Sequence, residues 1–480
     1  MNQDELKKLT ISTASELLAS KKLSSVELTQ ATLDVIEQQE PVINAFITVT
    51  KEIALARAKQ VDELRAKNER LSILAGIPYS LKDVYNVKGV QTTGGAKILE
   101  GYISPYDATV EVLMKKSNAV LLGKTNCDSF GFGTTGEHSG FGPTKNPINI
   151  EYVPGGSSSG SGASLVYGGG VFSIGEDTGG SIRCPASFCG LAGLKTTYGR
   201  VSRYGAAPYA SSYDTMGPMA RNVKDVAIVL EHLAGQDARD ATTGTAEVLP
   251  YSTLLDKSIK GMKIGMPKEY FGEGLDPEVR ASMEHAADVF RSLGAEVIEI
   301  SLPYTEYAVA AYYVIGTSET SSNLARLDGI RYGIEGEGDT WMQKIKDVRG
   351  KGFNDEAKRR IMVGTYALSA GYADQYYKKA QQVRQLLKKD FVRAFTEVDV
   401  IMTPTMPVLP PKIGENESDP LKLWLMDAFT VSVNPVGVPG LSVPTGFAKN
   451  GLPIGMQLIA PHFREDIILN VGYQFEQEVK

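Results

Sequence analysis

The chain has 480 residues, 42% of them apolar and 22% charged, with a formal net charge of −6 at pH 7. These values exclude a disordered or fibrous chain and are typical of a globular protein. The acidic balance argues against a surface that coats nucleic acid, although a local basic patch remains possible. No apolar run reaches the roughly 18 residues that a membrane span needs. The 3 cysteines show no regular framework, which indicates a reducing cytoplasm without disulfides.

The first 70 residues are predicted to be a helical segment. Two residue pairs have the Ser/Thr-x-x-Glu spacing of capping boxes, namely Thr13 with Glu16 and Ser24 with Glu27. The second of these helices should end near Pro41, because proline does not continue a helix easily. Apolar and charged residues alternate over 53–70, which predicts a third helix with a solvated side.

Residues 74–84 indicate a buried strand that carries Lys82 near its end. A lysine in an apolar run either extends its amine to water or finds a buried partner. Further strands are expected over 119–123 and 171–174, and a helix-like piece over 185–194.

Strands and helices alternate through the rest of the chain. We expect strands over 262–266, 295–300, 397–402, 441–443 and 454–459, and helices over 223–233, 277–293 and 465–478. Residues 304–395 are predicted to form a helix-rich insertion. This alternation predicts an α/β fold whose mixed, mostly parallel sheet is covered by helices on both faces. We expect a single domain over residues 1–480.

Residues 154–200 hold glycine and serine at a density that a plain helix or strand does not tolerate. The first turn runs from Gly155 to Ser159, the second from Asp177 to Ser181, and the expected strand lies between them. Glycine allows close backbone approach, so the amides of residues 178–181 can converge on one point, as an oxyanion hole requires. Ser181 would lie beside that point.

Three other chemistries fit these motifs less well. A phosphate loop would need glycine before Lys195, where leucine stands. Cys184 and Cys189 have no third ligand nearby, so they are better read as small buried side chains than as a metal site. The run 156–160 satisfies G-x-S-x-G, but an elbow nucleophile needs an acid and a histidine. The histidine must lie downstream, and none of the three there has a distinctive flank: His232, His285 and His462.

A serine nucleophile can instead be activated by a lysine. Lys82 would have to be uncharged to accept a proton, and its apolar strand favours that state. A second serine between the lysine and the nucleophile would relay the proton.

The order and spacing of Lys82, the GGSS run and the DTGGS run resemble the amidase signature family. This resemblance implies the family's α/β fold and a Ser-Ser-Lys triad: Ser181 as acyl-enzyme nucleophile, Ser157 as the bridging serine held by a cis peptide, and Lys82 as the base. It also implies an oxyanion hole made by the amides of Thr178, Gly179, Gly180 and Ser181, with no cofactor and no metal.

Nearly the whole chain is also similar to the family of A subunits of tRNA-dependent amidotransferases. Segments that carry this likeness include LAGIPYSLKD, GKTNCD, FGPTKNP, ASSYDTMGP, RRIMVGTYALSAGY and VPGLSVPTGF. The likeness implies that the chain hydrolyses glutamine and supplies ammonia within a cytoplasmic heterotrimer. A B subunit would bind the tRNA and use ATP and Mg²⁺ to activate Glu-tRNA(Gln) or Asp-tRNA(Asn), and a small C subunit would hold the complex together.

By the same likeness, Tyr312, Arg360 and Asp427 bind free glutamine, with Arg360 on its α-carboxylate and Asp427 on its α-ammonium. The alternative for Arg360 is a surface arginine like its neighbour Arg359. Several residues depart from the usual family text and could change the lining of the pocket: Cys127, Ser129, Gly136, Glu137, His138, Ser159 and Cys184.

Two other roles stay open for the whole chain. One is a stand-alone amidase that acts on a small amide, and the other is a non-catalytic scaffold protein within such a complex. Lys82, Ser157 and Ser181 are all present, which makes the scaffold the weakest of the three readings.

Overall fold

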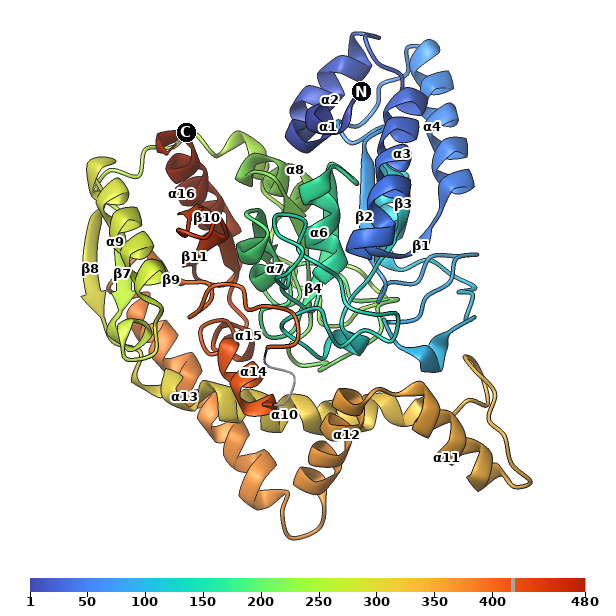
Figure 1. Ribbon diagram of the computed structural model, residues 1–480. Coiled ribbons are helices and arrows are strands. Elements are labelled where there is room, and N and C mark those ends of the chain that lie inside the picture. The colour runs from blue at the N-terminus through green and yellow to red at the C-terminus, as the bar shows by residue number, and fades with distance from the viewer. Residues whose placement is uncertain (416–418, 480) are drawn as a thin grey trace.

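The computed structural model describes residues 1–415 and 419–479. Its centre is an 11-stranded sheet in the order β1-β3-β2-β4-β6-β5-β10-β11-β9-β7-β8 (Figure 1). The strands are β1 Phe46–Val49, β2 Pro78–Lys82, β3 Val120–Thr125, β4 Phe172–Asp177, β5 Ala192–Lys195, β6 Thr215–Ala220, β7 Lys263–Pro267, β8 Glu296–Ile300, β9 Val400–Pro404, β10 Gly440–Phe447 and β11 Pro453–Ile459.

The helices are α1 Gln3–Lys8, α2 Ile11–Ala19, α3 Ser25–Ile43, α4 Lys51–Ala66, α5 Thr109–Lys116, α6 Ser159–Tyr167, α7 Arg183–Phe188, α8 Val223–Leu233, α9 Pro277–Ser292, α10 Ala308–Asn323, α11 Trp341–Gly352, α12 Asp355–Leu368, α13 Lys379–Ala394, α14 Pro420–Met426, α15 Val433–Val436 and α16 Glu465–Glu478. Among the described residues, none of these helices is long and apolar enough to cross a membrane.

The α/β class and the mixed sheet are confirmed, but parallel pairing is confined to two groups of strands. β2 runs parallel to β3 and β4, and β7 runs parallel to β8 and β9. The remaining neighbours pair antiparallel, which gives the sheet a larger antiparallel share than the sequence analysis expected. Part of the reason is local, because a short hairpin joins β10 to β11 and only antiparallel strands allow such a connection.

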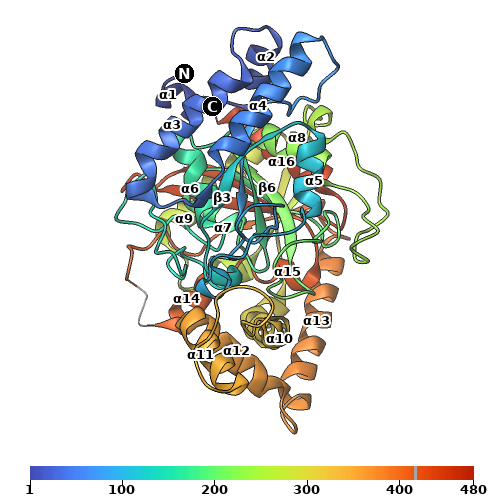
Figure 2. The same cartoon turned by 90° about the vertical axis from the view of Figure 1, so that its right-hand side faces the viewer.

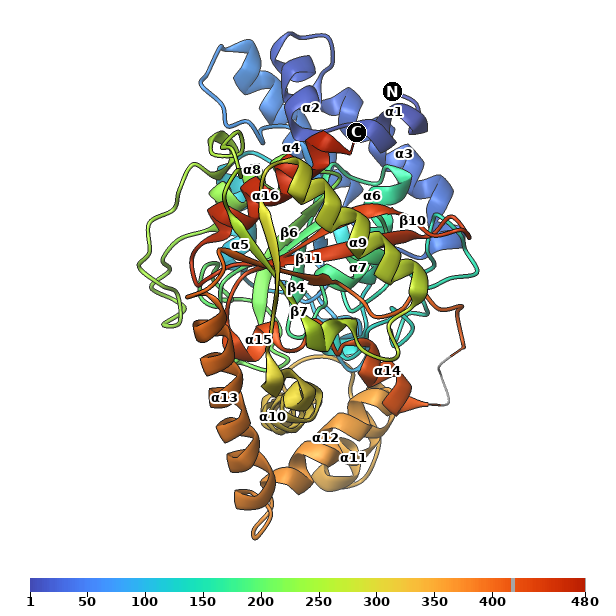
Figure 3. The ribbon, with the colours of Figure 1, turned by 90° about the vertical axis from the view of Figure 1, so that its left-hand side faces the viewer.

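Helices cover both faces of the sheet, as expected. On β10, Gly440 faces the Arg183 side chain of α7, whereas its neighbour Leu441 contacts Gly472 of α16. Successive residues of a strand point to opposite faces, so α7 and α16 lie on opposite sides. Figures 2 and 3 show these layers from the two ends of the sheet.

Helices α1–α4 lie within the first 70 residues, with β1 between α3 and α4, and α10–α13 lie within residues 304–395. The blue helices α1–α4 gather beside the β1–β3 end of the sheet, and α10–α13 form a separate layer at the bottom of Figure 1. Two details differ from the sequence analysis. Thr10, not Thr13, is the N-cap of α2, and Thr13 serves as the third residue of that capping box. Helix α3 continues through Pro41 to Ile43 before Asn44 ends it with a φ of 56°.

The expected helical piece over 185–194 is wrong in its second half. Helix α7 ends at Phe188, Gly190 adopts a φ of +66°, and β5 begins at Ala192. A left-handed glycine commonly ends a helix, and here it redirects the chain into the sheet. The sequence analysis also missed β1 and β6.

Candidate active site

Lys82 is the last residue of β2 and has no solvent exposure. Its amine does not reach water. Instead Nζ lies 2.7 Å from Ser157 Oγ and 2.8 Å from Glu176 Oε2. The second of the alternatives considered for this lysine, a buried partner, is therefore the observed one.

The two glycine-serine turns meet at this lysine. The peptide bond between Gly156 and Ser157 is cis, and the Ser158 amide donates to the carbonyl oxygen of Ser181 at 3.1 Å. Ser181 is 6% exposed, so its side chain lies just below the surface. Among the described residues no direct hydrogen bond joins the Ser157 and Ser181 hydroxyls, and that link of the triad stays a prediction.

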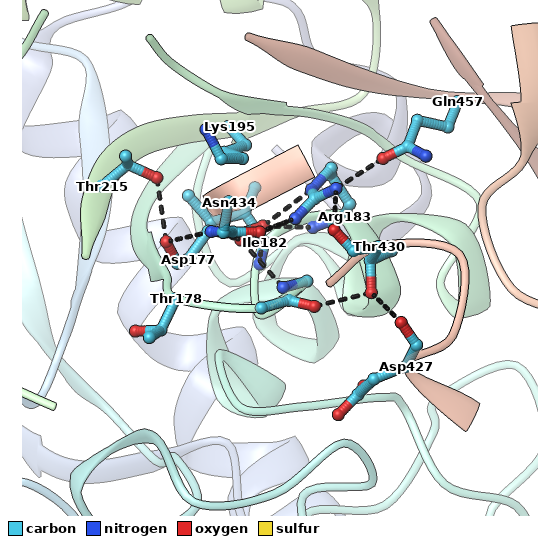
Figure 4. Close-up of polar contacts among 12 residues, drawn as sticks. Asp177, Thr178, Ile182, Arg183, Lys195, Thr215, Asp427, Thr430, Asn434 and Gln457 are labelled. Carbon is cyan, nitrogen blue, oxygen red and sulfur yellow. Dashed lines mark hydrogen bonds and ion pairs between the residues drawn. The ribbon is translucent and has the colours of Figure 1, made fainter. Parts of the chain in front are cut away.

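A buried carboxylate fixes the shape of the Ser181 turn (Figure 4). Asp177 at the end of β4 accepts hydrogen bonds from the backbone amides of Gly180 at 2.8 Å and Ile182 at 3.1 Å. Both of its oxygens also accept from the Arg183 guanidinium, at 2.9 and 3.0 Å. Although burial opposes it, the Arg183 charge holds the pKa of Asp177 well below its usual range. The turn is thus held by a charged side chain rather than left flexible.

This arrangement corrects one member of the expected oxyanion hole. The Gly180 amide points at Asp177 Oδ1 and is already used. Within the described part of the chain, the amides of Thr178, Gly179 and Ser181 donate no hydrogen bond, so they remain the candidate donors.

The three residues expected to bind glutamine lie around one aromatic cluster. Tyr312 stacks on Tyr213, with 5.5 Å between the ring centroids. A Cβ built on Gly179 would lie 2.4 Å from the Tyr312 hydroxyl, so this tyrosine is in contact with the turn that carries Ser181. The aromatic cluster and the turn are therefore adjacent.

Arg360 is buried at 3% exposure, whereas the side chain of its neighbour Arg359 is 41% exposed. The guanidinium of Arg360 donates to Glu356 at 2.7 Å and to the Tyr209 hydroxyl at 2.5 Å. It also lies over the ring of Tyr313, 5.3 Å from the centroid. The alternative reading of Arg360 as a surface arginine is therefore wrong.

Asp427 accepts hydrogen bonds from Thr134 at 2.8 Å and from Tyr313 at 2.7 Å. Burial raises the pKa of this carboxyl to about 6, although both hydrogen bonds lower it. The sequence analysis missed Thr134, Tyr209 and Tyr313, because nothing in their local pattern separates a pocket wall from ordinary core.

Three of the residues that depart from the usual family text are Cys184, Ser159 and His138. Cys184 is buried and its thiol donates to the carbonyl oxygen of Thr134, the residue that bonds Asp427. Burial raises the pKa of this thiol well above its usual value. Ser159 contacts Thr144 at 3.2 Å, and the amide of His138 donates to Asp128 at 2.7 Å. Of these, Cys184 is linked to the expected glutamine pocket.

Two buried acids beside Lys82 were not singled out from the sequence. Glu176 contacts the lysine directly, and Thr178 Oγ1 contacts both Glu176 Oε1 and Asp214 Oδ1. Burial first, and then the charge of Glu176, raise the pKa of Asp214 to about 8. The signal that drew attention to Lys82, a charge in a buried strand, also applied to Glu176.

In the described residues no cluster of three or more His, Cys, Asp and Glu could hold a metal ion.

A protein-family model, Amidase, matches residues 27–469 of the chain. The chain therefore belongs to the amidase family. The A subunit of glutamyl-tRNA(Gln) amidotransferase from Koribacter versatilis is 50% identical over 469 residues, and the match covers 98% of each sequence.

Solved structures agree with this assignment. The crystal structure of the corresponding glutamyl-tRNA(Gln) amidotransferase A subunit from Thermotoga maritima superposes with a TM-score of 0.82 at 37% identity, covering 99% of this chain and 96% of that one. A bacterial aryl acylamidase of the amidase signature family gives a TM-score of 0.87 at 26% identity, covering 98% and 96%.

Proposed function

We propose that this chain is the glutamine-hydrolysing subunit of a tRNA-dependent amidotransferase. Ser181 attacks the side-chain amide carbon of glutamine, and its proton passes through Ser157 to an uncharged Lys82. The free amides of Thr178, Gly179 and Ser181 stabilise the oxyanion that forms on the amide oxygen. The relay returns the proton to the leaving nitrogen, ammonia departs, and water then hydrolyses the glutamyl ester on Ser181 to release glutamate.

One observation carries this proposal. Lys82 Nζ and Ser157 Oγ lie 2.7 Å apart in a site without solvent exposure, beside the turn that Asp177 fixes around Ser181. Distances of this size are the ones that proton transfer needs. In this proposal Lys82 is uncharged, because only the uncharged amine can accept a proton.

The expected substrate contacts fit glutamine. Arg360 offers a planar guanidinium suited to a carboxylate, and Asp427 offers an anion suited to an ammonium group. Both side chains are buried and contact Tyr313, which packs on the Tyr312 ring beside Gly179, and this grouping supports a small amino acid as the substrate.

The partners follow from the relatives rather than from this chain. We propose that a B subunit binds the misacylated tRNA and activates it with ATP and Mg²⁺, and that a C subunit joins the two in the cytoplasm. Ammonia would convert Glu-tRNA(Gln) to Gln-tRNA(Gln), or Asp-tRNA(Asn) to Asn-tRNA(Asn). We also propose that residues 1–480 act as one domain, with the helices of 304–395 as an insertion.

A stand-alone amidase is the second candidate, because an aryl acylamidase shares the fold over nearly the whole chain. The two candidates differ in what the full chain hydrolyses. We expect glutamine hydrolysis that rises when the partner proteins and charged tRNA are added, with little turnover of unrelated amides. Fast, partner-independent hydrolysis of varied amides would favour the second candidate.

A further inference from the structure

A continuous chain of polar contacts leads from Lys82 to residues other than Ser157. Lys82 Nζ lies 2.8 Å from Glu176 Oε2, and the other oxygen of Glu176 contacts Thr178 Oγ1. Thr178 Oγ1 in turn lies 2.7 Å from Asp214 Oδ1. Glu176, Thr178 and Asp214 are at most 3% exposed. In Figure 4 the Thr178 side chain has no contact with the Asp177 network, so this chain is separate from the contacts that hold the turn.

The number of hydrogen atoms available to Glu176, Thr178 and Asp214 fixes the total charge of these three side chains. The Thr178 hydroxyl carries one hydrogen and faces a carboxyl oxygen on each side, so it donates to only one of them. The other carboxyl must therefore carry a proton and donate it in a hydrogen bond to Thr178 Oγ1. If that carboxyl were ionised, its oxygen would face a lone pair of Thr178 Oγ1 inside the protein, and the two would repel each other. Glu176 and Asp214 therefore hold one proton between them. The charge of Glu176 raises the pKa of Asp214, so protonation of one acid favours ionisation of the other.

The far end of the chain reaches a cavity. Asp214 lines a space of about 190 Å³ together with Arg203, Tyr204, Arg239 and Asp240. Tyr204 is 37% exposed and the Arg239 side chain 44% exposed, so this space extends to the protein surface. Water occupies about 30 Å³ per molecule, so the cavity has room for several.

The proposed function creates a proton that needs such an exit. Hydrolysis of glutamine to glutamate and uncharged ammonia releases one proton per turnover, because the new γ-carboxyl group ionises. Ammonia that kept this proton would be ammonium, which has no lone pair with which to attack an activated ester. Lys82 is the group on which the excess proton collects.

We propose that Glu176, Thr178 and Asp214 carry this proton from Lys82 to the cavity beside Arg203. The inference rests on the proposed glutamine hydrolysis and goes beyond it by adding relay residues outside the triad. None of the three side chains needs to touch the substrate.

One proton leaves Lys82 and one proton reaches water in each cycle of the relay. At rest Lys82 is uncharged and the two acids share one proton through Thr178, and the transfer starts when that proton lies on the Glu176 oxygen that faces Thr178. When Lys82 has gained a proton, it passes that proton to the near oxygen of Glu176. Glu176 gives the proton on its far oxygen to Thr178, and Thr178 gives its own to Asp214. Asp214 releases a proton to water in the cavity, and rotation of the Glu176 carboxyl and of the Thr178 hydroxyl restores the resting state.

The test compares two variants of the full chain, Thr178→Val and Asp214→Asn, with Thr196→Val as the matched control. Thr178→Val keeps the shape and removes the hydroxyl. Asp214→Asn keeps an oxygen for one of the two backbone amides, those of Tyr209 and Ala210, that bond separate oxygens of the carboxylate. The control loses a buried hydroxyl that donates to the Met216 carbonyl and lies outside the chain of contacts. Unfolding curves identify the variants that retain the fold. If only one of the two relay variants folds, that variant alone tests the proposal.

We expect both relay variants to lower kcat for glutamine by about 10- to 100-fold, the range that positioned proton transfer supplies, and to leave KM within about twofold. A third variant, Asp214→Ala, should regain much of kcat when imidazole or formate is added, because these small buffers can enter the cavity in place of the carboxyl. A purely structural defect would not respond to them.

The pH profile gives an independent readout. Burial and the charge of Glu176 raise the pKa of Asp214 to about 8, so the proton that the two acids share is lost above that pH; kcat of the unaltered chain should therefore fall as pH rises through about 8, and this limb should vanish in Asp214→Asn. The titratable groups that face Asp214 are Glu176, Arg203, Tyr85 and Tyr198. Unchanged kcat in both relay variants, or a loss that no buffer restores, would overturn the relay alone. Absence of glutamine hydrolysis by the unaltered chain would overturn the proposed function and the relay with it.

Discussion

The strongest stability prediction concerns Asp177, which holds the turn of the proposed nucleophile. Asp177→Asn replaces one oxygen by an amide that faces the donors, and it leaves the Arg183 charge without a counter-ion in a site where both side chains have 0% exposure. Breaking a buried ion pair from one side costs about 3 to 5 kcal/mol. Arg183 keeps neutral acceptors at Thr430, Gln457 and Asn434, which places the expected loss at about 3 kcal/mol, the lower end of that range.

Urea unfolding measures this loss, with Asp288→Asn as the matched control. Asp288 pairs with Arg291 at the surface, where the side chains are 73% and 52% exposed, so its replacement should change stability by less than about 0.5 kcal/mol. Because the turn also sets the position of Ser181, we expect kcat of Asp177→Asn to fall by about 100-fold, the effect of a small misplacement of reacting groups. A loss below about 1 kcal/mol together with unchanged kcat would refute the role given to Asp177.

The sign of the pH dependence follows from the same contacts. The pKa of Asp177 is depressed in the folded chain, so its contribution is fully present above its unfolded pKa of about 4. This contribution to stability is lost only as pH falls further, towards the pKa of Asp177 in the folded chain. Replacing Asp177 should therefore lower stability equally at pH 5 and pH 8.

Three further predictions concern the pocket. Arg360→Lys should raise KM for glutamine by about 10- to 100-fold, because a lysine cannot make a paired contact with a carboxylate, while the exposed neighbour change Arg359→Lys should have little effect. Asp427 has a pKa of about 6, so KM should rise as pH falls below that value and the carboxylate is lost, and Asp427→Asn should abolish this dependence. Gly179→Ala adds a methyl group 2.4 Å from a tyrosine hydroxyl and should lower kcat at least tenfold, whereas Gly272→Ala points into open space and should not. Steady-state kinetics of glutamine hydrolysis check all three.

Much of the fold was accessible from the sequence because local signals agreed with tertiary packing. Helices α8 and α16 occupy the expected residues, since their apolar faces repeat with helical spacing and they begin at clear boundaries. Strand β2 was expected from its apolar run, although the expected range of 74–84 extends beyond the observed Pro78–Lys82 at both ends. Strand β6 was missed because Thr215–Ala220 contains a glycine and a proline, which are rare in strand interiors.

The site could be predicted only where the order of residue types in the sequence itself indicates the chemistry. Lysine in an apolar strand and a serine in a glycine-rich turn indicated Lys82 and Ser181, whereas Ser157 was singled out by the resemblance to the amidase signature family. The hydrogen bond that removes Gly180 from the oxyanion hole depends on where the Asp177 carboxylate points, which no sequence pattern specifies. The contact of Glu176 with Asp214 through Thr178 likewise arises only when β4 pairs with β6.

The most direct test of the whole account is the identification of the acylated residue. The full chain is mixed with glutamine, quenched with acid within one turnover, digested and analysed by mass spectrometry. We predict a glutamyl ester on Ser181 that does not accumulate when Lys82 is replaced by methionine or Ser157 by alanine. Acylation of a different residue, or undiminished ester formation without the Lys82 amine, would contradict the claim that this lysine activates Ser181 through Ser157.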